Sequence, residues 1–165
     1  MYAAGMKGGP REIKGFGGPC RLMAEYDAMA HWLFKSEPSA WSFEKLAGLG
    51  AAGTVWSGVR NHTAKQNMKA MKVGEQGFFY HSGEGKEIVG LVEVSKAYRP
   101  DPTDASGKFG MVDIRALRPL PRPVKLEEVK AEKRLANMAL VTNSRLSVQP
   151  VSDAEWALVC KMGGL

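Results

Sequence analysis

The stretch HWLFKSEPSAWSF, residues 31–43, holds the clearest local fold signals in this chain of 165 residues. Its first five residues, HWLFK, predict a short buried strand. Pro38 biases Glu37 toward an extended conformation, so we expect the strand to end there. Lys35 and Ser36 therefore lie at a strand end, a place where functional residues often concentrate.

Two helices are expected after this strand. Ser42 is a candidate N-cap for a short helix over residues 42–49. Residues 60–72 carry apolar side chains at positions i, i+4 and i+7, which indicates an amphipathic helix, and we expect Gly74 to end it. The apolar faces are formed by Phe43, Leu46 and Leu49 in the first helix and by Ala64, Met68 and Met71 in the second.

Strand patterns occupy the middle of the chain. GTVWSG (53–58) is typical of a loop or a short strand, while QGFFYHS (76–82) and EIVGLVEVSKAY (87–98) are β-rich runs that GEGK joins as a hairpin. GMVDIRALRPL (110–120) alternates apolar with charged residues, which predicts a strand with one solvated face. We expect the prolines at 119–123 to stop this strand.

The C-terminal region adds helices and one strand. A short helix is expected over 125–132 and a helical stretch over 133–140, and RLSVQPV (145–151) predicts a final strand. Ser152 and Glu155 match a capping box for a last helix. Short strands with a few helices and no βαβ alternation predict an α+β domain built on a closed or nearly closed barrel, with the amphipathic helix covering one end or edge.

The composition fits one globular domain, with 24% charged and 44% hydrophobic residues. Residues 1–29 carry Gly-Gly-Pro twice and show no sustained period, so we expect a flexible N-terminal extension before one domain over 30–165. No apolar run approaches the roughly 18–20 residues that span a bilayer, and we expect no signal peptide. Cys20 and Cys160 are expected to be free thiols in a reducing compartment.

The net charge of the chain is +6, of which residues 31–165 contribute +5. The basic balance therefore belongs to the expected domain and not to the extension. Phosphates attract lysine and arginine whatever the base sequence, so this charge is compatible with a nucleic-acid partner. It is equally compatible with a mildly basic soluble protein.

Four clusters of polar and aromatic residues fall at the ends of expected elements. Two of them end strands, one opens the amphipathic helix, and one begins the final strand. The glycine in the second cluster allows close backbone approach, and the start of a helix favours an anion. The clusters are Lys35, Ser36 and Glu37; Trp56, Gly58, Arg60 and Asn61; Tyr80, His81 and Ser82; and Arg145 and Ser147.

Each cluster also has a purely structural interpretation. Glu37 would be a solvated charge, Arg60 would bond a helix end, and His81 would be a satisfied core histidine. The other three tryptophans are expected in the core, whereas Trp56 lies among small and polar residues. No hydrolase elbow, phosphate loop, dinucleotide fingerprint or zinc pattern is present, so we expect no metal and no cofactor.

Six blocks occur in order between about residues 31 and 162, namely WLFKSEPSAWSF, WSGVRN, MKVGEQGFFYHS, IVGLVEV, YRPDP and SRLSVQPVSDAEW. Together they resemble the EVE domain family, which includes thymocyte nuclear protein and bacterial relatives. The resemblance implies a PUA-like fold, a pseudo-barrel of short strands with peripheral helices, akin to YTH and ASCH domains. It also implies nucleic-acid binding, with a pocket for a modified base such as 5-methylcytosine or 5-hydroxymethylcytosine.

The family's motifs match all four clusters and add Val59 to the second. With this resemblance, Trp56 is expected to stack on an extruded base, with Tyr80 as a second wall. The residues expected to read base edges are Ser36, Glu37, Asn61 and Ser82, with Glu37 accepting from a cytosine amino group. The residues expected to hold phosphate or to brace the pocket are Lys35, Arg60 and Arg145.

The chain departs from the family pattern after Asn61. The family continues through an aromatic residue to Ala-Arg-Asn, whereas this chain has His62 and then Thr-Ala-Lys-Gln. Lysine lacks the planar fork of arginine, which puts a bidentate phosphate contact at Lys65 in question. A tryptophan that the family has before VDI is replaced around Phe109.

Two other functions are compatible with the same residues. Lys35, Glu37, Tyr80 and His81 are candidate acid–base groups of a PUA-like hydrolase or nuclease that acts on RNA or modified nucleosides. A protein-interaction module would use the clusters only to brace the barrel. The favoured hypothesis is a non-catalytic module that recognises a modified base, foremost a 5-modified cytosine, in DNA or RNA. We expect it in the bacterial cytosol, free or associated with the nucleoid, with no membrane or metal partner.

Overall fold

The structure is a computed structural model that describes residues 30–83 and 85–165. The extension expected over residues 1–29, with Cys20, and residue 84 of the GEGK hairpin lie outside the described residues. Cys160 is a free thiol. The elements, in chain order, are β1 (His31–Ser36), α2 (Phe43–Gly48), the 3-10 helix η1 (Gly50–Ala52), β2 (Thr54–Trp56), α3 (His62–Ala70), β3 (Gln76–His81), β4 (Glu87–Pro100), β5 (Gly110–Lys125), α4 (Leu126–Ala131), the 3-10 helix η2 (Lys133–Leu135), α5 (Ala139–Thr142), β6 (Val148–Val151) and α6 (Asp153–Met162).

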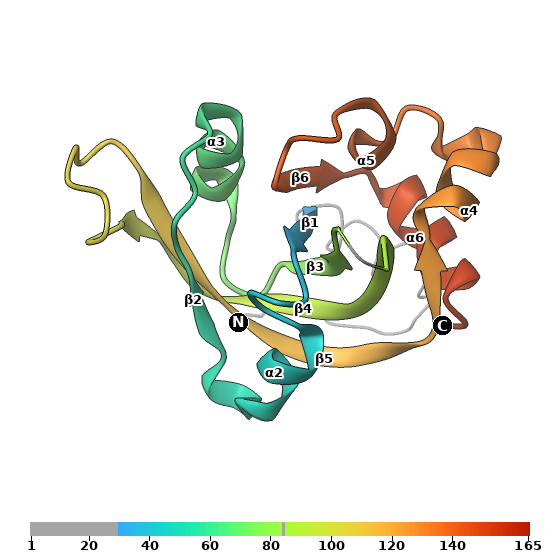
Figure 1. Cartoon of the computed structure of the whole chain (residues 1–165), viewed down its shortest axis with the longest axis horizontal. Coiled ribbons are helices and arrows are strands. Elements are labelled where there is room, and N and C mark those ends of the chain that lie inside the picture. The colour runs from blue at the N-terminus through green and yellow to red at the C-terminus, as the bar shows by residue number, and fades with distance from the viewer. Residues whose placement is uncertain (1–29, 84) are drawn as a thin grey trace, which may run out of the picture.

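One six-stranded sheet, in the order β2-β5-β4-β3-β1-β6, organises the fold. The pair β1 and β3 is parallel, and the other four pairs are antiparallel. Long, curved β4 and β5 cross the molecule, and β2 and β6 form the edges of the described sheet (Figure 1). The expected α+β class is confirmed, with an open edge on each side of the sheet in place of full closure.

The sheet separates two hydrophobic cores, because successive strand residues face opposite sides. Phe34 and Phe79 belong to the first core, which α2 and α3 cover. Leu33 and Phe78 belong to the second core, which α4, α5 and α6 cover. Figure 1 shows α3 on one side of the molecule and α4, α5 and α6 grouped on the other. Residues adjacent in one strand therefore belong to different hydrophobic cores.

The helix starts follow the capping signals of the sequence. The Ser42 hydroxyl accepts a hydrogen bond from the Lys45 backbone at 3.1 Å, as expected for an N-cap. Ser152 and Glu155 form the predicted capping box, with bonds of 2.9 and 3.2 Å between their side chains and backbones. These predictions are confirmed because a cap needs only residues that lie within one helical turn of each other in the sequence.

Two expectations about element ends are wrong. Leu49 is 43% exposed, because α2 ends at Gly48 and Leu49 lies beyond the last turn as its C-cap. The amphipathic helix ends at Ala70 and not at Gly74, because Met71 is already extended and directs its side chain into the first core. Gly74, with φ +97°, belongs to the turn before β3 and donates its N–H to the Val94 carbonyl.

Strand β5 also differs from the expectation, because its prolines do not stop it. Ile88 of β4 lies opposite Val124 and Gly90 lies opposite Pro119, so residues 120–123 form a bulge that faces Val89 alone. A bulge removes the ladder hydrogen bonds that proline cannot make. The expected solvated face is wrong at Asp113, which is buried and accepts a hydrogen bond from Arg99 at 2.6 Å.

Candidate nucleic-acid interface

The parallel pairing of β1 with β3 brings two of the predicted clusters together. Lys35 is the register partner of Tyr80, and Ser36 is the partner of His81. The Ser82 backbone N–H then donates to the Ser36 carbonyl at 2.9 Å. Parallel strands end at the same sheet edge, so the residues that follow both strands line one location.

Residues 144–147, which carry the fourth cluster, lie against the end of β1. The Lys35 backbone N–H donates to the Ser147 carbonyl at 2.9 Å, and the Lys35 ammonium group donates to the Ser144 carbonyl at 2.5 Å. Arg145 is exposed on this loop. Lys35 therefore braces the loop, which is the second of the two roles expected for it, and Arg145 remains the cation that faces solvent.

Gln149 supports the same loop from inside and was missed by sequence reasoning. It is fully buried, and its amide nitrogen donates to the carbonyls of Leu146 at 2.9 Å and Asn143 at 3.3 Å. A glutamine between apolar strand residues carries no local signal of such a role. Gln149 can stabilise the loop only because the chain turns back before β6 and brings the Asn143 and Leu146 carbonyls to its amide.

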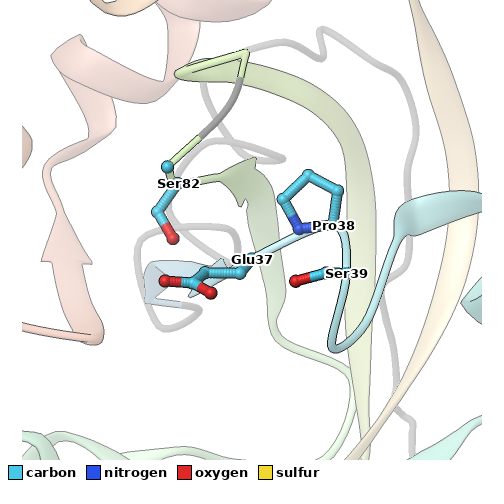
Figure 2. A pocket seen from close by; sticks show the side chains of 5 residues that line it. Glu37, Pro38, Ser39 and Ser82 are labelled. Atoms are coloured by element: carbon cyan, nitrogen blue, oxygen red, sulfur yellow. The ribbon is translucent and has the colours of Figure 1, made fainter.

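A cavity of about 310 Å³ opens where β1 and β3 end. Figure 2 shows the Glu37 carboxylate and the hydroxyls of Ser39 and Ser82 directed into the same space. Gly83 closes one side with φ +70°, and a Cβ there would contact Glu37 at 3.8 Å. Pro38 completes the lining. The cavity thus offers a carboxylate acceptor and two hydroxyls, a set that can bond the polar edge of a base.

Trp56 packs against the first core near this end of the sheet. Its ring meets Phe34 edge-on at 5.3 Å between centroids and Phe79 at 6.0 Å. The indole remains partly exposed. Ser36 is the next residue of β1 on the face of Phe34, about 7 Å further along the strand. Trp56 and Ser36 therefore lie on the same side of the sheet.

Tyr80 does not face Trp56, so its expected role as a second wall is wrong. Tyr80 is 3% exposed and lies in the second core. Strand alternation places Phe79, its neighbour, on the side of Trp56. Burial raises the pKa of Tyr80, and the Lys35 ammonium lies 5.7 Å from its ring centroid.

The Trp56–Asn61 segment is held in place by a carboxylate that sequence reasoning missed. Asp101 is 3% exposed. Its side chain accepts from the Gly58 backbone at 2.9 Å and from Arg60 at 3.2 Å, and Thr103 donates to it through both its backbone and its hydroxyl. Burial alone would raise the pKa of Asp101, but these hydrogen bonds outweigh it and hold the pKa well below its ordinary value. Arg60 therefore braces the segment.

Two other members of the second cluster have structural roles. The Asn61 side-chain oxygen accepts from the Ala64 backbone at 2.9 Å, so it caps α3 and is not directed at a base edge. Val59 is buried in the first core. Among these residues, the partly exposed Trp56 ring remains available to a ligand.

His81 is also held by the fold. The Phe43 backbone N–H donates to His81 Nε2 at 3.1 Å, which fixes the start of α2. Burial lowers the pKa of His81, which favours the neutral acceptor form. His81 lies on the sheet face of Phe79, whereas Lys35 and Tyr80 face the opposite side. The four acid–base candidates therefore do not converge on one point.

The positions where this chain departs from the family pattern contact one another. His62 lies 5.0 Å from the Phe109 ring, and the Lys65 ammonium and the Arg60 guanidinium lie 5.7 and 5.8 Å from its centroid. These residues join the start of α3 to the loop between β4 and β5. Their proximity could be found only from the structure, because more than forty residues separate them.

The described part of the chain holds no cluster of three side chains that could ligate a metal ion. None of its helices is long and apolar enough to cross a membrane.

Known proteins are similar to this chain over most of its length. A family model described as EVE domain matches residues 30–162. Human thymocyte nuclear protein 1 is 33% identical over an alignment that covers 81% of this chain and 73% of the human protein. The solved structure of Rpa0253 from Rhodopseudomonas palustris is 62% identical, with a TM-score of 0.79 over 82% of this chain and 94% of that one.

Two further solved structures have a similar fold. Human THYN1 in complex with DNA containing 5-methylcytosine is 33% identical and superposes with a TM-score of 0.76, covering 82% of this chain and 98% of that one. The YTH domain of Zygosaccharomyces rouxii MRB1 is 18% identical, with a TM-score of 0.53 over 84% of this chain and 87% of that one. The latter likeness concerns the fold alone, and it agrees with the expected PUA-like architecture.

Proposed function

The chain belongs to the EVE domain family, and we propose that it is a module that binds nucleic acid carrying a modified base, with 5-methylcytosine in DNA as the first candidate. The observation that carries the proposal is the human relative, which was solved with 5-methylcytosine DNA and shares the fold over most of this chain. The site residues support it through their chemistry.

In this proposal an extruded base stacks on the exposed part of Trp56. Its polar edge reaches the strand ends, where Ser36 offers a hydroxyl and Glu37 offers a carboxylate acceptor. Glu37 accepts from the exocyclic amino group of cytosine, and Ser82 lies across the cavity from it. Arg145 contacts a phosphate from the neighbouring loop. Extrusion costs a few kcal/mol, which stacking and edge contacts offset.

Binding assays with matched oligonucleotides test this function. The set pairs one DNA and one RNA sequence, each with cytosine or 5-methylcytosine at a single position. Base–aromatic stacking contributes about 1–3 kcal/mol, so Trp56→Ala should weaken binding of the preferred oligonucleotide by about 5- to 150-fold, and Trp56→Phe by less. The control is Val55→Ala, because Val55 is the neighbouring strand residue and is 39% exposed.

The proposal fails if folded Trp56→Ala binds every oligonucleotide as the wild type does. It also fails if the wild type shows no preference for a modified base. The DNA and RNA members of the set separate the two polymers, and replacing 5-methylcytosine with 5-hydroxymethylcytosine ranks the two modifications.

A further inference from the structure

The segment from Arg60 to Gly74, which contains α3, concentrates positive charge without any carboxylate. It holds four lysine and arginine residues and no aspartate or glutamate. By contrast, residues 122–134 around α4 hold five cations against three carboxylates. Because the chain beyond residue 30 has a net charge of +5, much of its positive charge lies on this one short segment, which we name the α3 basic segment.

The packing of α3 directs these lysines outward. Ala64 and Met68 are buried in the first core. Asn67 donates to the Val148 carbonyl of β6 at 2.7 Å, which fixes the flank of α3 that faces β6. At about 100° per residue, Lys65 and Lys69 lie about 200° around the helix from Asn67. Their side chains therefore occupy the flank away from β6, on the side of the loop that carries Phe109.

The lysines of this segment are not neutralised within the described chain. Residues 30–83 and 85–165 contain no ion pair to Lys65, Lys69 or Lys72. Lys69 and Lys72 are exposed. The nearest carboxylate in sequence is Glu75, which is buried and accepts from Trp32 and from backbone N–H groups. Within the described residues, the segment thus presents positive charge that no ion pair compensates.

The position of the segment relative to Trp56 suggests its partner. Trp56 ends β2 and α3 begins at His62, so the basic segment starts beside the proposed stacking ring. Lys65 and Lys69 are separated by about 6 Å along α3 at 1.5 Å per residue, and Lys72 lies just beyond the end of the helix. Each strand of duplex DNA carries one charge per about 3.4 Å of the helix axis, so this length matches about two consecutive phosphates of one strand.

We propose that the α3 basic segment binds the phosphate backbone of the strand flanking the modified base, through Lys65, Lys69 and Lys72. The partner is therefore a polymer, and a free modified nucleoside would occupy only part of the interface. This inference rests on the proposed function for the identity of the base, but the phosphate contacts themselves are independent of base modification.

The test uses the full chain and the salt dependence of binding. Each neutralised phosphate contributes about −0.9 to the slope of log K against log salt concentration for duplex DNA. Lys69→Gln with Lys72→Gln should therefore lower the magnitude of the slope by about 1.8. The matched control, Lys130→Gln with Lys133→Gln, removes two exposed lysines near α4 on the other side of the sheet, and it should leave the slope unchanged.

Two further measurements separate this inference from the function on which it rests. The ratio of affinities for methylated and unmethylated DNA should be the same in the α3 double variant and the wild type. Binding of 5-methylcytidine alone should be insensitive to both double variants. If the wild type shows no methylation preference while the α3 variant still loses slope, the base assignment fails and the phosphate surface stands.

An unchanged slope in the folded α3 double variant would overturn the inference, as would an equal loss in the α4 control. A variant that loses affinity for the free nucleoside would place these lysines at the base and not at the backbone. If the wild type binds no oligonucleotide, both the inference and the proposed function are overturned.

Discussion

The Asp101 carboxylate accepts a hydrogen bond from the Gly58 backbone across 43 residues of sequence, at 2.9 Å. Gly58 has φ +80°, a conformation that favours glycine. Asp101 thereby fixes the backbone between the Trp56 ring and the start of α3. The position of the proposed stacking surface depends on a buried charge at the beginning of the loop between β4 and β5.

Asp101→Asn should destabilise the protein by about 3 kcal/mol, because one acceptor oxygen becomes an amide donor that faces existing donors. Urea denaturation measures this change in the free energy of unfolding. The control is Asp153→Asn, which removes a carboxylate that is 62% exposed and pairs with His31. Exposed pairs contribute below about 1 kcal/mol. Equal losses in both variants would contradict the structural role of Asp101.

Acid should remove the contribution of Asp101. Its pKa in the folded protein lies well below the ordinary value of 3.8, so the ionised form stabilises the fold. That stabilisation is complete above the unfolded-state pKa and is lost as pH falls toward the folded-state pKa. The difference in unfolding free energy between wild type and Asp101→Asn should narrow below about pH 4. A difference that stays constant from pH 6 to pH 3 would show that ionisation is not involved.

His81 should be neutral at pH 7, with its proton on Nδ1, because Nε2 accepts from Phe43. Burial lowers its pKa, so the stability that this bond provides is present above the unfolded-state pKa of about 6.5 and declines as pH falls below it. Nitrogen-15 NMR of the histidine side chains distinguishes the two tautomers. A proton found on Nε2 at pH 7 would rule out the hydrogen bond that holds the start of α2.

Gly90→Ala should destabilise the protein by about 1–3 kcal/mol, because a Cβ at this position would overlap the ring of Phe43. Phe43 opens α2, so the change should also loosen the helix that follows the Glu37 turn. Gly48→Ala is the matched control, since nothing lies within 4 Å of its Cβ position in α2. That variant should be neutral or stabilise the protein by up to about 1 kcal/mol. Thermal denaturation of both proteins measures the contrast.

The sequence predicts those elements whose signals are local. Strand β1 begins and ends near the expected residues, and the caps at Ser42 and Ser152 form as their spacing indicates. Errors appear where tertiary pairing decides the outcome. The prolines at 119–123 would end an isolated strand, but in the folded chain residues 120–123 form a bulge of β5 opposite β4, and the strand continues.

The candidate site shows the same division. The family resemblance groups Ser36, Glu37 and Ser82, and in the structure these residues lie together where the parallel strands β1 and β3 end. It assigns Tyr80 to the wrong side, since the face of a strand residue depends on register with its neighbours. It also misses Asp101 and Gln149, whose partners are fixed by loops that only the folded chain brings near.

The bond between the Lys35 backbone and the Ser147 carbonyl has a consequence for biosynthesis. Lys35 is translated well before residues 144–147 and β6. Domains generally fold as units during synthesis. Here the loop over residues 144–147 can bond to Lys35 only after that loop has been made, together with β6, the antiparallel partner of β1. A chain that ends before residue 144 therefore lacks the Arg145 side of the candidate interface, so the proposed binding surface is complete only after β6 has been made.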